Sequence, residues 1–349
     1  ILKNITLKNI LDKNYFEFCE INFQTNINKK ICNDLLIYFE DLENKSFNIK
    51  KLIKILRPNL ILSQMNLGLF AALGYYGNQF GIKSILISHG SHINHNNCKY
   101  SKREHQILAR NLLHNNYNIL AIQSPLAKEY LDNNYNDKNV QIISIKPLIW
   151  GNIEKLDNKN SDNTFKIIHA SSLKYRHQKR YIYETGDEYV SALIDIINVL
   201  KNYRNLELII KTRPQEYEMT IKSLINLLGD LPTNVSIETN EKFIDVLKNS
   251  NLLISFSSTT IEESLSNKIP VLMYGGNGRY SHIPIEEFNK LNNSINVITF
   301  IKNHKNLDLY FEKISKNTAI LNIENKLFNK YSFDDSNSIS FYKWFNENI

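Results

Sequence analysis

The stretch that decides the fold is residues 251–276, with the sequence NLLISFSSTTIEESLSNKIPVLMYGG. Its apolar runs at 252–254 and 271–273 have the length of buried strands. Residues 261–266 between them have helical spacing, with Glu262 and Glu263 in the first turn, where acidic groups suit the helix dipole. The stretch therefore predicts a strand, a polar turn, a helix and a second strand of an α/β sheet.

Hydroxyl side chains crowd the turn of this unit. They are Ser255, Ser257, Ser258, Thr259 and Thr260. One hydroxyl is enough to cap a helix, whereas several donors at a helix N-terminus form a site for an anion. We predict a phosphate site at Ser257, Ser258 and Thr259, with simple helix capping as the alternative. Beyond the second strand, Gly275 and Gly276 permit close approach of the backbone to a ligand.

Length and composition favour an α/β protein of two domains. The chain has 349 residues, of which 42% are hydrophobic, and a net charge of +7 with a pI near 9.0. The charge favours anionic partners such as a nucleotide, an acidic glycan or the face of an anionic membrane. The chain has no long run of lysines and arginines with interleaved aromatic residues, so nucleic acid is a weaker candidate partner. Because the first residue is Ile1, we expect that residues upstream are missing.

The cysteines and the apolar segments indicate the compartment. The three cysteines are scattered, which argues against a disulfide scaffold or structural zinc and favours a reducing cytoplasm. No segment approaches the ~20 apolar residues of a membrane span. We therefore expect a cytoplasmic protein, with peripheral contact to an anionic inner membrane as an open alternative.

The first half of the chain predicts a layer of alternating strands and helices. Strands are predicted at 60–63, 84–88, 119–123 and 141–145, and a helix rich in small residues at 67–80. Residues 1–54 have a mainly helical pattern with one extended candidate at 18–23, and Ser124 and Pro125 predict the start of another helix. The best candidate for a linker is 146–161, which sets the first domain at residues 1–160.

His89 directly follows the predicted strand 84–88, with Gly90 and Ser91 behind it. Ligands of open α/β sheets bind beyond the carboxyl ends of the strands. His89 is therefore a candidate general base, and binding to a backbone carbonyl is the alternative. A metal site from His89, His92 and His95 needs a helix to bring the three together, whereas this segment has the composition of a loop. We expect no metal and no cofactor.

The second half repeats the alternation of strands and helices, which sets a domain at 161–332. A closing C-terminal helix is predicted at 338–345, within the segment 333–349. A strand at 165–169 leads to Ser171 and Ser172 and then to the most basic segment of the chain, which contains Arg176, Lys179 and Arg180. These residues are candidates for contacts with a phosphate or an acidic acceptor, and a solvated loop is the alternative.

A long helix is predicted from Glu184 to 202. Glu184, Asp187 and Glu188 are candidate general bases, or carboxylates placed to suit the dipole of that helix. A strand at 206–211 leads to Lys211, Arg213 and Pro214, where the two cations suit a phosphate. Glu262 is a further candidate contact with the nucleotide or the acceptor.

Three short motifs resemble those of a known group of enzymes. Lys211-Thr-Arg-Pro214 is similar to the Lys-x-His-Pro segment of bacterial transferases that use CMP-sugars, such as sialyltransferases and Kdo transferases. The Ser255–Thr259 turn is similar to their serine motif, which holds the nucleotide phosphate. Ser88-His89-Gly90-Ser91 is similar to the His-Gly-Thr segment of teichoic-acid glycerophosphate transferases, which use CDP-alcohols. Arg213 stands where both families have histidine, which leaves the donor open.

The resemblance implies the GT-B architecture, in which two Rossmann-like domains face a cleft and a C-terminal helix closes the chain. It also implies a metal-independent glycosyltransferase of surface-polysaccharide synthesis, acting in lipopolysaccharide or capsule formation. The expected donor is a CMP-activated ulosonic acid, and the acceptor is a glycan or a lipid-linked chain. A CDP-alcohol polyol-phosphate transferase, a sugar-nucleotide 2-epimerase and a non-catalytic glycan-binding module are the alternatives, because a fold alone does not give a function. The sequence does not predict the oligomeric state.

Overall fold

The computed structural model describes residues 26–88, 109, 112–113, 116–134, 140–148, 150–153, 164–170, 184–213, 218–276, 282–334 and 336–348. The described residues up to Ile87, together with those of 110–120 and 140–142, form one compact unit, and the others form a second. No helix in the described part of the chain has the length and apolar character needed to cross a bilayer.

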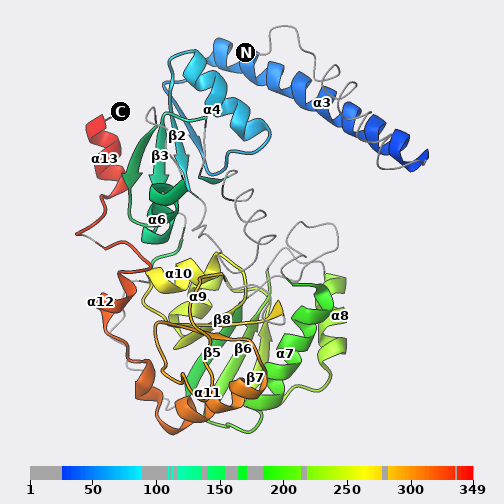
Figure 1. The fold of residues 1–349 in the computed structure, drawn as a ribbon, viewed down its shortest axis with the longest axis vertical. Helices are drawn as coiled ribbons and strands as arrows, with labels where there is room; N and C mark the ends of the chain where they lie inside the picture. Colours follow the sequence, from blue (N-terminus) through cyan, green and yellow to red (C-terminus); the bar gives the residue numbers. More distant parts are fainter. Residues whose placement is uncertain are drawn as a thin grey trace. The chain divides into compact units, whose positions relative to one another are not determined.

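The first sheet has the order β1-β2-β3-β4. Figure 1 labels its two central strands, β2 and β3. Its strands are β1 (Leu60–Ser63), β2 (Lys83–Ile87), β3 (Ile119–Ile122) and β4 (Gln141–Ser144), as the sequence predicted. The helices around it are α3 (Asn26–Leu56), α4 (Leu69–Gln79) and α6 (Pro125–Asn134). Since β1 and β2 are parallel, α4 is the crossover between them.

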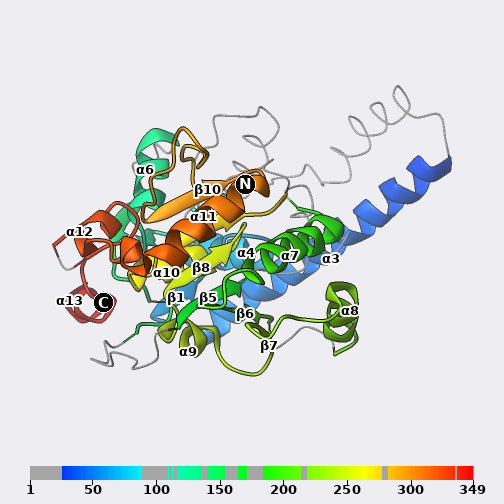
Figure 2. The ribbon, with the colours of Figure 1, turned by 90° about the horizontal axis from the view of Figure 1, so that it is seen from below.

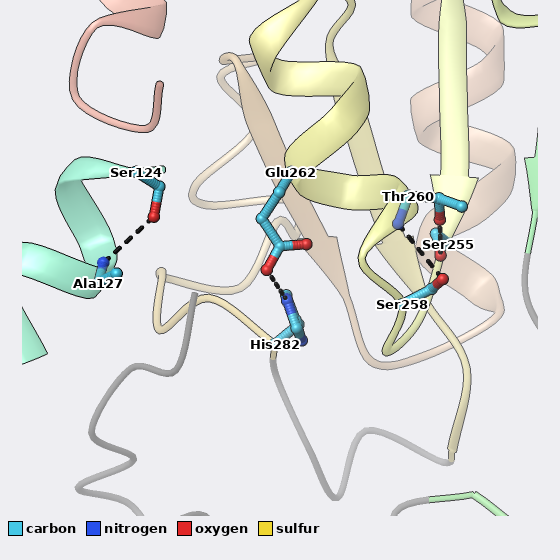
Figure 3. Close-up of polar contacts among 7 residues, drawn as sticks. All are labelled: Ser124, Ala127, Ser255, Ser258, Thr260, Glu262 and His282. Carbon is cyan, nitrogen blue, oxygen red and sulfur yellow. Dashed lines mark hydrogen bonds and ion pairs between the residues drawn. The ribbon is translucent and has the colours of Figure 1, made fainter. Parts of the chain in front are cut away.

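Local signals explain the helices of this sheet. A Cβ atom at Gly77 of α4 would lie 2.9 Å from Cδ1 of Ile61 in β1, so the small residue permits close packing of helix on strand. Gly81 has φ 67° just after α4, as expected for a residue that ends a helix. Ser124 caps α6, because its Oγ accepts a hydrogen bond from the Ala127 amide at 3.2 Å (Figure 3).

The second sheet has six strands in the order β10-β9-β8-β5-β6-β7. The strands are β5 (Phe165–Ala170), β6 (Leu206–Lys211), β7 (Val235–Glu238), β8 (Leu252–Ser255), β9 (Val271–Tyr274) and β10 (Ile298–Ile301). Every neighbouring pair is parallel. The chain starts at β5, builds one half of the sheet outward to β7, and then returns to β8 to build the other half. The point between β5 and β8 is therefore the topological switch point, where sheets of this kind bind ligands.

Two hydrophobic cores cover the two faces of this sheet, because successive side chains of a strand point to opposite faces. Ile167 of β5 belongs to the core with α7 (Gly186–Leu200), α8 (Glu218–Leu228) and α11 (Lys305–Lys316). Ile168 belongs to the core with α9 (Phe243–Lys248) and α10 (Thr260–Ser266). Figure 2 shows these helices beside the sheet. The chain continues through η4 (Thr318–Leu321), α12 (Asn325–Phe328) and α13 (Phe341–Asn348).

Three helices differ from the sequence prediction. Helix α7 begins at Gly186, because Thr185 caps it in a reciprocal capping box with Glu188, so Glu184 precedes the helix. Helix α13 begins at Phe341 and not at Ser338, because Ile339 pairs with Ile145 in a parallel bridge. Helix α8 was not predicted at all. The extended candidate at 18–23 lies outside the described residues.

Candidate functional site

The switch point of the second sheet is held together by two hydroxyl groups of the polar turn. Ser255 Oγ donates a hydrogen bond to the Ala170 carbonyl at 2.7 Å, and Thr260 Oγ1 donates to the same carbonyl at 3.3 Å. Ser255 and Thr260 also lie 3.4 Å apart (Figure 3). These two hydroxyls therefore join the carboxyl ends of β5 and β8, which is a structural role.

The other hydroxyls of the turn have a different environment. Ser258 Oγ accepts a hydrogen bond from the Thr260 amide at 3.3 Å. Thr259 precedes α10, and its side chain makes no capping bond. Ser257 is only 6% exposed, and within the described part of the chain its Oγ has no hydrogen-bond partner. A buried hydroxyl without a partner costs about 1–3 kcal/mol, so an acceptor group of a ligand beside Ser257 would remove this cost.

Glu184 reaches the backbone that follows β9. It is 1% exposed, and its Oε1 accepts a hydrogen bond from the Gly276 amide at 3.2 Å. Gly275 has φ 146°, and a Cβ atom there would lie 2.6 Å from Glu184 Oε1 and 3.0 Å from Cβ of Phe256. Only glycine fits at this point. The carboxylate, the polar turn and the two glycines therefore meet at one edge of the sheet, and the catalytic role of Glu184 stays a prediction.

Glu262 of α10 forms a pair with His282, which follows β9 in the chain. Glu262 Oε1 lies 3.0 Å from His282 Nε2, and both side chains are buried (Figure 3). The predicted contact of Glu262 with a ligand is untested, but this oxygen already has a protein partner. His282 was not among the predicted site residues, and no local signal points to it, because the pair joins residues that are twenty positions apart.

The two cations at the end of β6, Lys211 and Arg213, differ in exposure. Lys211 is buried, and its Nζ donates to the Thr212 carbonyl at 2.6 Å and contacts the Glu238 carbonyl at 3.5 Å. Its ammonium thus holds the backbone between the ends of β6 and β7. Arg213 is exposed. The phosphate-binding role of Lys211 and the catalytic role of Arg213 stay predictions.

His169 is a buried titratable group at the switch point. The sequence predicted it only as the last residue of a strand. It is 2% exposed in β5, and its ring centroid lies 5.9 Å from that of Tyr189. Its Nδ1 has no hydrogen-bond partner among the described residues. Burial lowers the pKa of His169 from 6.5 to about 4. The imidazole is therefore neutral at physiological pH.

The remaining predicted site residues lie outside the described residues. They are His89, Gly90, Ser91, Ser171, Ser172, Arg176, Lys179, Arg180 and Pro214. Among the described residues there is no group of three His, Cys, Asp or Glu side chains suited to a metal ion.

Gln123 holds the backbone that follows β2 and β4. It lies at the end of β3 and is 1% exposed; its Nε2 donates to the Ser88 carbonyl at 2.5 Å, and its Oε1 accepts from the Leu148 amide. One side chain therefore holds two backbone segments at the carboxyl edge of the first sheet. Gln123 was not among the predicted site residues, although a polar residue directly after the apolar run 119–122 was a usable signal.

Residues 151–153, within the predicted linker, are bound to α10. Glu263 Oε1 accepts from the Gly151 amide at 2.9 Å, and Asn267 Oδ1 accepts from the Ile153 amide at 2.7 Å. Asn267 Nδ2 also donates to the Gly151 carbonyl at 2.8 Å. Positions i and i+4 lie on one face of a helix, so α10 presents both side chains to this segment. Burial raises the pKa of Glu263.

Comparison with known proteins gives a fold and not a family. No protein-family model matches the chain, and no curated protein sequence matches it. Among solved structures, Staphylococcus aureus MnaA with UDP superposes at a TM-score of 0.54 and 12% identity, covering 88% of this chain and 80% of that chain. UDP-GlcNAc 2-epimerase from Neisseria meningitidis bound to UDP-GlcNAc gives 0.54 and 12%, with 83% and 78% covered. The glycosyltransferase of kitacinnamycin gives 0.50 and 14%, with 84% and 77% covered.

The chain has a GT-B type fold. The parallel strands of the two sheets agree with this assignment, and the predicted fold class is confirmed. At such low identities the likeness extends to the fold alone.

Proposed function

We propose that the chain is a metal-independent glycosyltransferase whose nucleotide-sugar donor binds at the carboxyl edge of the second sheet. The observation that carries this proposal is the buried Ser257 Oγ, which lies at the switch point without a partner among the described residues. The fold supports it, since the GT-B neighbours include a glycosyltransferase and structures with UDP or UDP-GlcNAc bound. Switch points of open sheets are also where nucleotides bind in general.

Each residue has a role that follows from its chemistry. Ser257, Ser258 and Thr259 donate hydrogen bonds to the donor phosphate. Arg213 stabilises the negative charge that grows on that phosphate as the bond to the sugar breaks, which is where a preorganised cation lowers the barrier most. His89 accepts the proton of the acceptor hydroxyl, whose oxygen forms the new bond to the anomeric carbon. The nucleotide leaves with the electron pair of the broken bond.

The donor we propose is a CMP-activated ulosonic acid, because the Lys211–Pro214 segment resembles that of CMP-sugar transferases. The acceptor is a surface glycan or a lipid-linked chain. UDP-sugars are the competing donor class, because UDP and UDP-GlcNAc are the ligands named for two GT-B neighbours. The two donor classes differ in the phosphate count at the site, so nucleotide preference separates them.

A sugar-nucleotide 2-epimerase is the second candidate. Structures described as UDP-GlcNAc 2-epimerases, from Neisseria meningitidis and Listeria monocytogenes, superpose at TM-scores of 0.54 and 0.52. An epimerase converts its UDP-sugar without an acceptor. Incubation with UDP-GlcNAc alone, followed by separation of the 2-epimers, therefore distinguishes the two activities.

Thermal unfolding with CMP, CDP, UDP, GDP or buffer tests the site, because a ligand that binds only the folded state raises the melting temperature. We expect one nucleotide to raise it for the wild type. Ser257→Ala should weaken the binding of that nucleotide about tenfold or more, since a hydrogen bond to a charged group contributes about 1.5–3 kcal/mol. Its melting temperature without nucleotide should not fall, because the substitution removes a buried hydroxyl that lacks a partner.

Ser250→Ala is the matched control for Ser257→Ala. Ser250 is also a buried serine, but it precedes β8 at the opposite end of the strand and donates to the Val246 carbonyl at 2.8 Å. This variant should lose stability and keep its nucleotide affinity. Absence of a shift with every nucleotide, or equal affinity of wild type and Ser257→Ala, would contradict the proposed site.

A further inference from the structure

One long segment of the chain carries positive charge only. Residues 44–103 contain nine lysines and arginines and no aspartate or glutamate. Six of these basic residues lie among the described residues, and five of the six fall at or just beyond the last turns of α3. The five are Lys45, Lys50, Lys51, Lys54 and Arg57. Lys45 pairs with Asp41 at 2.6 Å, which leaves a cluster of four basic residues near the end of the helix. The next acidic residue in the sequence is Glu104.

The same turns of α3 expose large apolar side chains. Leu52 is 50% exposed, Ile55 78% and Leu56 64%, and Phe47 earlier in the helix is also exposed. Ile53 in the same turns is buried. Apolar side chains alternating with lysines on an exposed helix surface are typical of helices that lie in the interface of a membrane. The exposed surface of α3 therefore has two features of such a helix, aliphatic groups and an excess of bases.

A cavity of about 520 Å³ lies at the end of α3. Its lining combines two bases with apolar groups: Ile53, Lys54, Arg57, Pro58, Phe80 and Ile82. The ammonium of Lys54 lies 5.6 Å from the centre of the Phe80 ring. This composition suits an anionic group attached to an apolar chain.

Arg57 ends α3 in an unfavourable backbone conformation. Its φ is 44°, and its amide donates to the Ile53 carbonyl at 2.9 Å. Glycine is the usual residue at this position of a helix end, because a Cβ atom is strained in the left-handed region. Here the strained position carries a guanidinium that lines the cavity, which ties the strain to a function of the side chain.

We propose that the last turns of α3, residues 45–57, dock with the adjoining cavity on the headgroup region of an anionic phospholipid bilayer. The aliphatic side chains enter the boundary between headgroups and acyl chains, while the bases contact anionic lipids. This surface belongs to the first unit, so the inference does not depend on the donor site in the second sheet. Docking brings the enzyme to the surface on which a lipid-linked acceptor is found.

Two other occupants fit the surface less well. A second copy would place the same bases opposite one another in a symmetric contact, where like charges repel. Nucleic acid is bound by bases together with aromatic side chains that stack on its rings. The exposed apolar groups here are mainly aliphatic, namely Leu52, Ile55 and Leu56.

Co-sedimentation of the full chain with vesicles tests the proposal. We expect binding to vesicles of phosphatidylcholine with phosphatidylglycerol, weak binding to phosphatidylcholine alone, and release by salt. Arg57→Gly should weaken binding about fivefold, as expected for one base at an anionic surface. Ile55→Ser should weaken it about tenfold through lost apolar burial. Because glycine relieves the strain at position 57, the melting temperature of Arg57→Gly should not fall.

The control variants are Lys290→Gly and Leu291→Ser, which remove an exposed base and a 99% exposed leucine from the second unit. Both should bind vesicles as the wild type does. The proposal is overturned by absence of vesicle binding, by equal binding to neutral vesicles, or by equal loss in the control variants. It is also overturned if the α3 variants abolish self-association or binding to an oligonucleotide while vesicle binding is unchanged.

Discussion

Replacing His169 with leucine should make the stability of the second sheet less sensitive to acid. His169 lies in β5 with its imidazole buried, and burial lowers its pKa from 6.5 to about 4. Between these two values the unfolded chain binds a proton that the folded protein excludes. The free energy of unfolding therefore falls as the pH falls from about 6.5 to about 4.

The size of the effect follows from the two pKa values. A tenfold change in proton affinity corresponds to about 1.4 kcal/mol, so the complete loss below about pH 4 is about 3 kcal/mol. At about pH 5 the unfolded histidine is almost fully protonated while the folded one is mostly neutral, which gives a loss of about 2 kcal/mol. His169→Leu cannot bind this proton. It should therefore lack this part of the loss, while its stability at about pH 8 stays within about 1 kcal/mol of the wild type.

Urea unfolding followed by tryptophan fluorescence measures this difference. Both tryptophans, Trp150 and Trp344, are buried in the unit that contains β5, so the signal reports on that unit. Between about pH 8 and about pH 5, the free energy of unfolding of the wild type should fall by about 2 kcal/mol more than that of His169→Leu. His304→Asn is the control, because His304 is exposed and its removal relieves no cost of burial. Equal losses in the wild type and His169→Leu would refute the reasoning.

Other substitutions test the carboxyl edges of both sheets. Gly275→Ala should cost about 2–3 kcal/mol in urea unfolding and reduce the nucleotide-induced rise in melting temperature, because its Cβ atom would lie 2.6 Å from a buried carboxylate oxygen. Gly229→Ala, at φ 70° with open space around it, should cost only about 1 kcal/mol. Gln123→Ala should cost about 2–4 kcal/mol, because it leaves the Ser88 carbonyl and a second backbone group without their partner. Tyr274→Phe should cost about 1–2 kcal/mol in the same assay through loss of its 2.6 Å bond to an aspartate of α7.

Much of the second sheet could be predicted because parallel strands are buried on both faces. Residues 252–254 and 271–273 are continuous apolar runs, and a polar turn or a proline marks their ends. Helix α8 was also within reach of the sequence. Ile221, Leu224 and Leu228 have helical spacing, and Gly229 follows the helix in the left-handed conformation. The start of α7 was similarly encoded in Thr185 and Glu188, which have the spacing of a capping box.

The roles of individual hydroxyls could not be predicted, because their partners come from other strands. Ser255 and Thr260 bind the carbonyl of Ala170, about ninety positions earlier in the chain, while the neighbouring Ser257 Oγ does not. All three look alike in the sequence. For the same reason the pairing of Ile339 with Ile145 was hidden behind a helical pattern, and the predicted start of the closing helix was wrong.

The bridge between Ile145 and Ile339 has a consequence during synthesis of the chain. The Lys146 amide donates to the Ile339 carbonyl at 3.1 Å, and the Ile339 amide donates to the Ser144 carbonyl at 3.1 Å. At about 5–20 residues per second, the ribosome adds position 339 roughly 10–40 s after position 145. Until then the backbone after β4 lacks these two partners and is open to strands of other nascent chains. A chaperone that covers this edge should therefore increase the yield of folded protein more than one that acts after release.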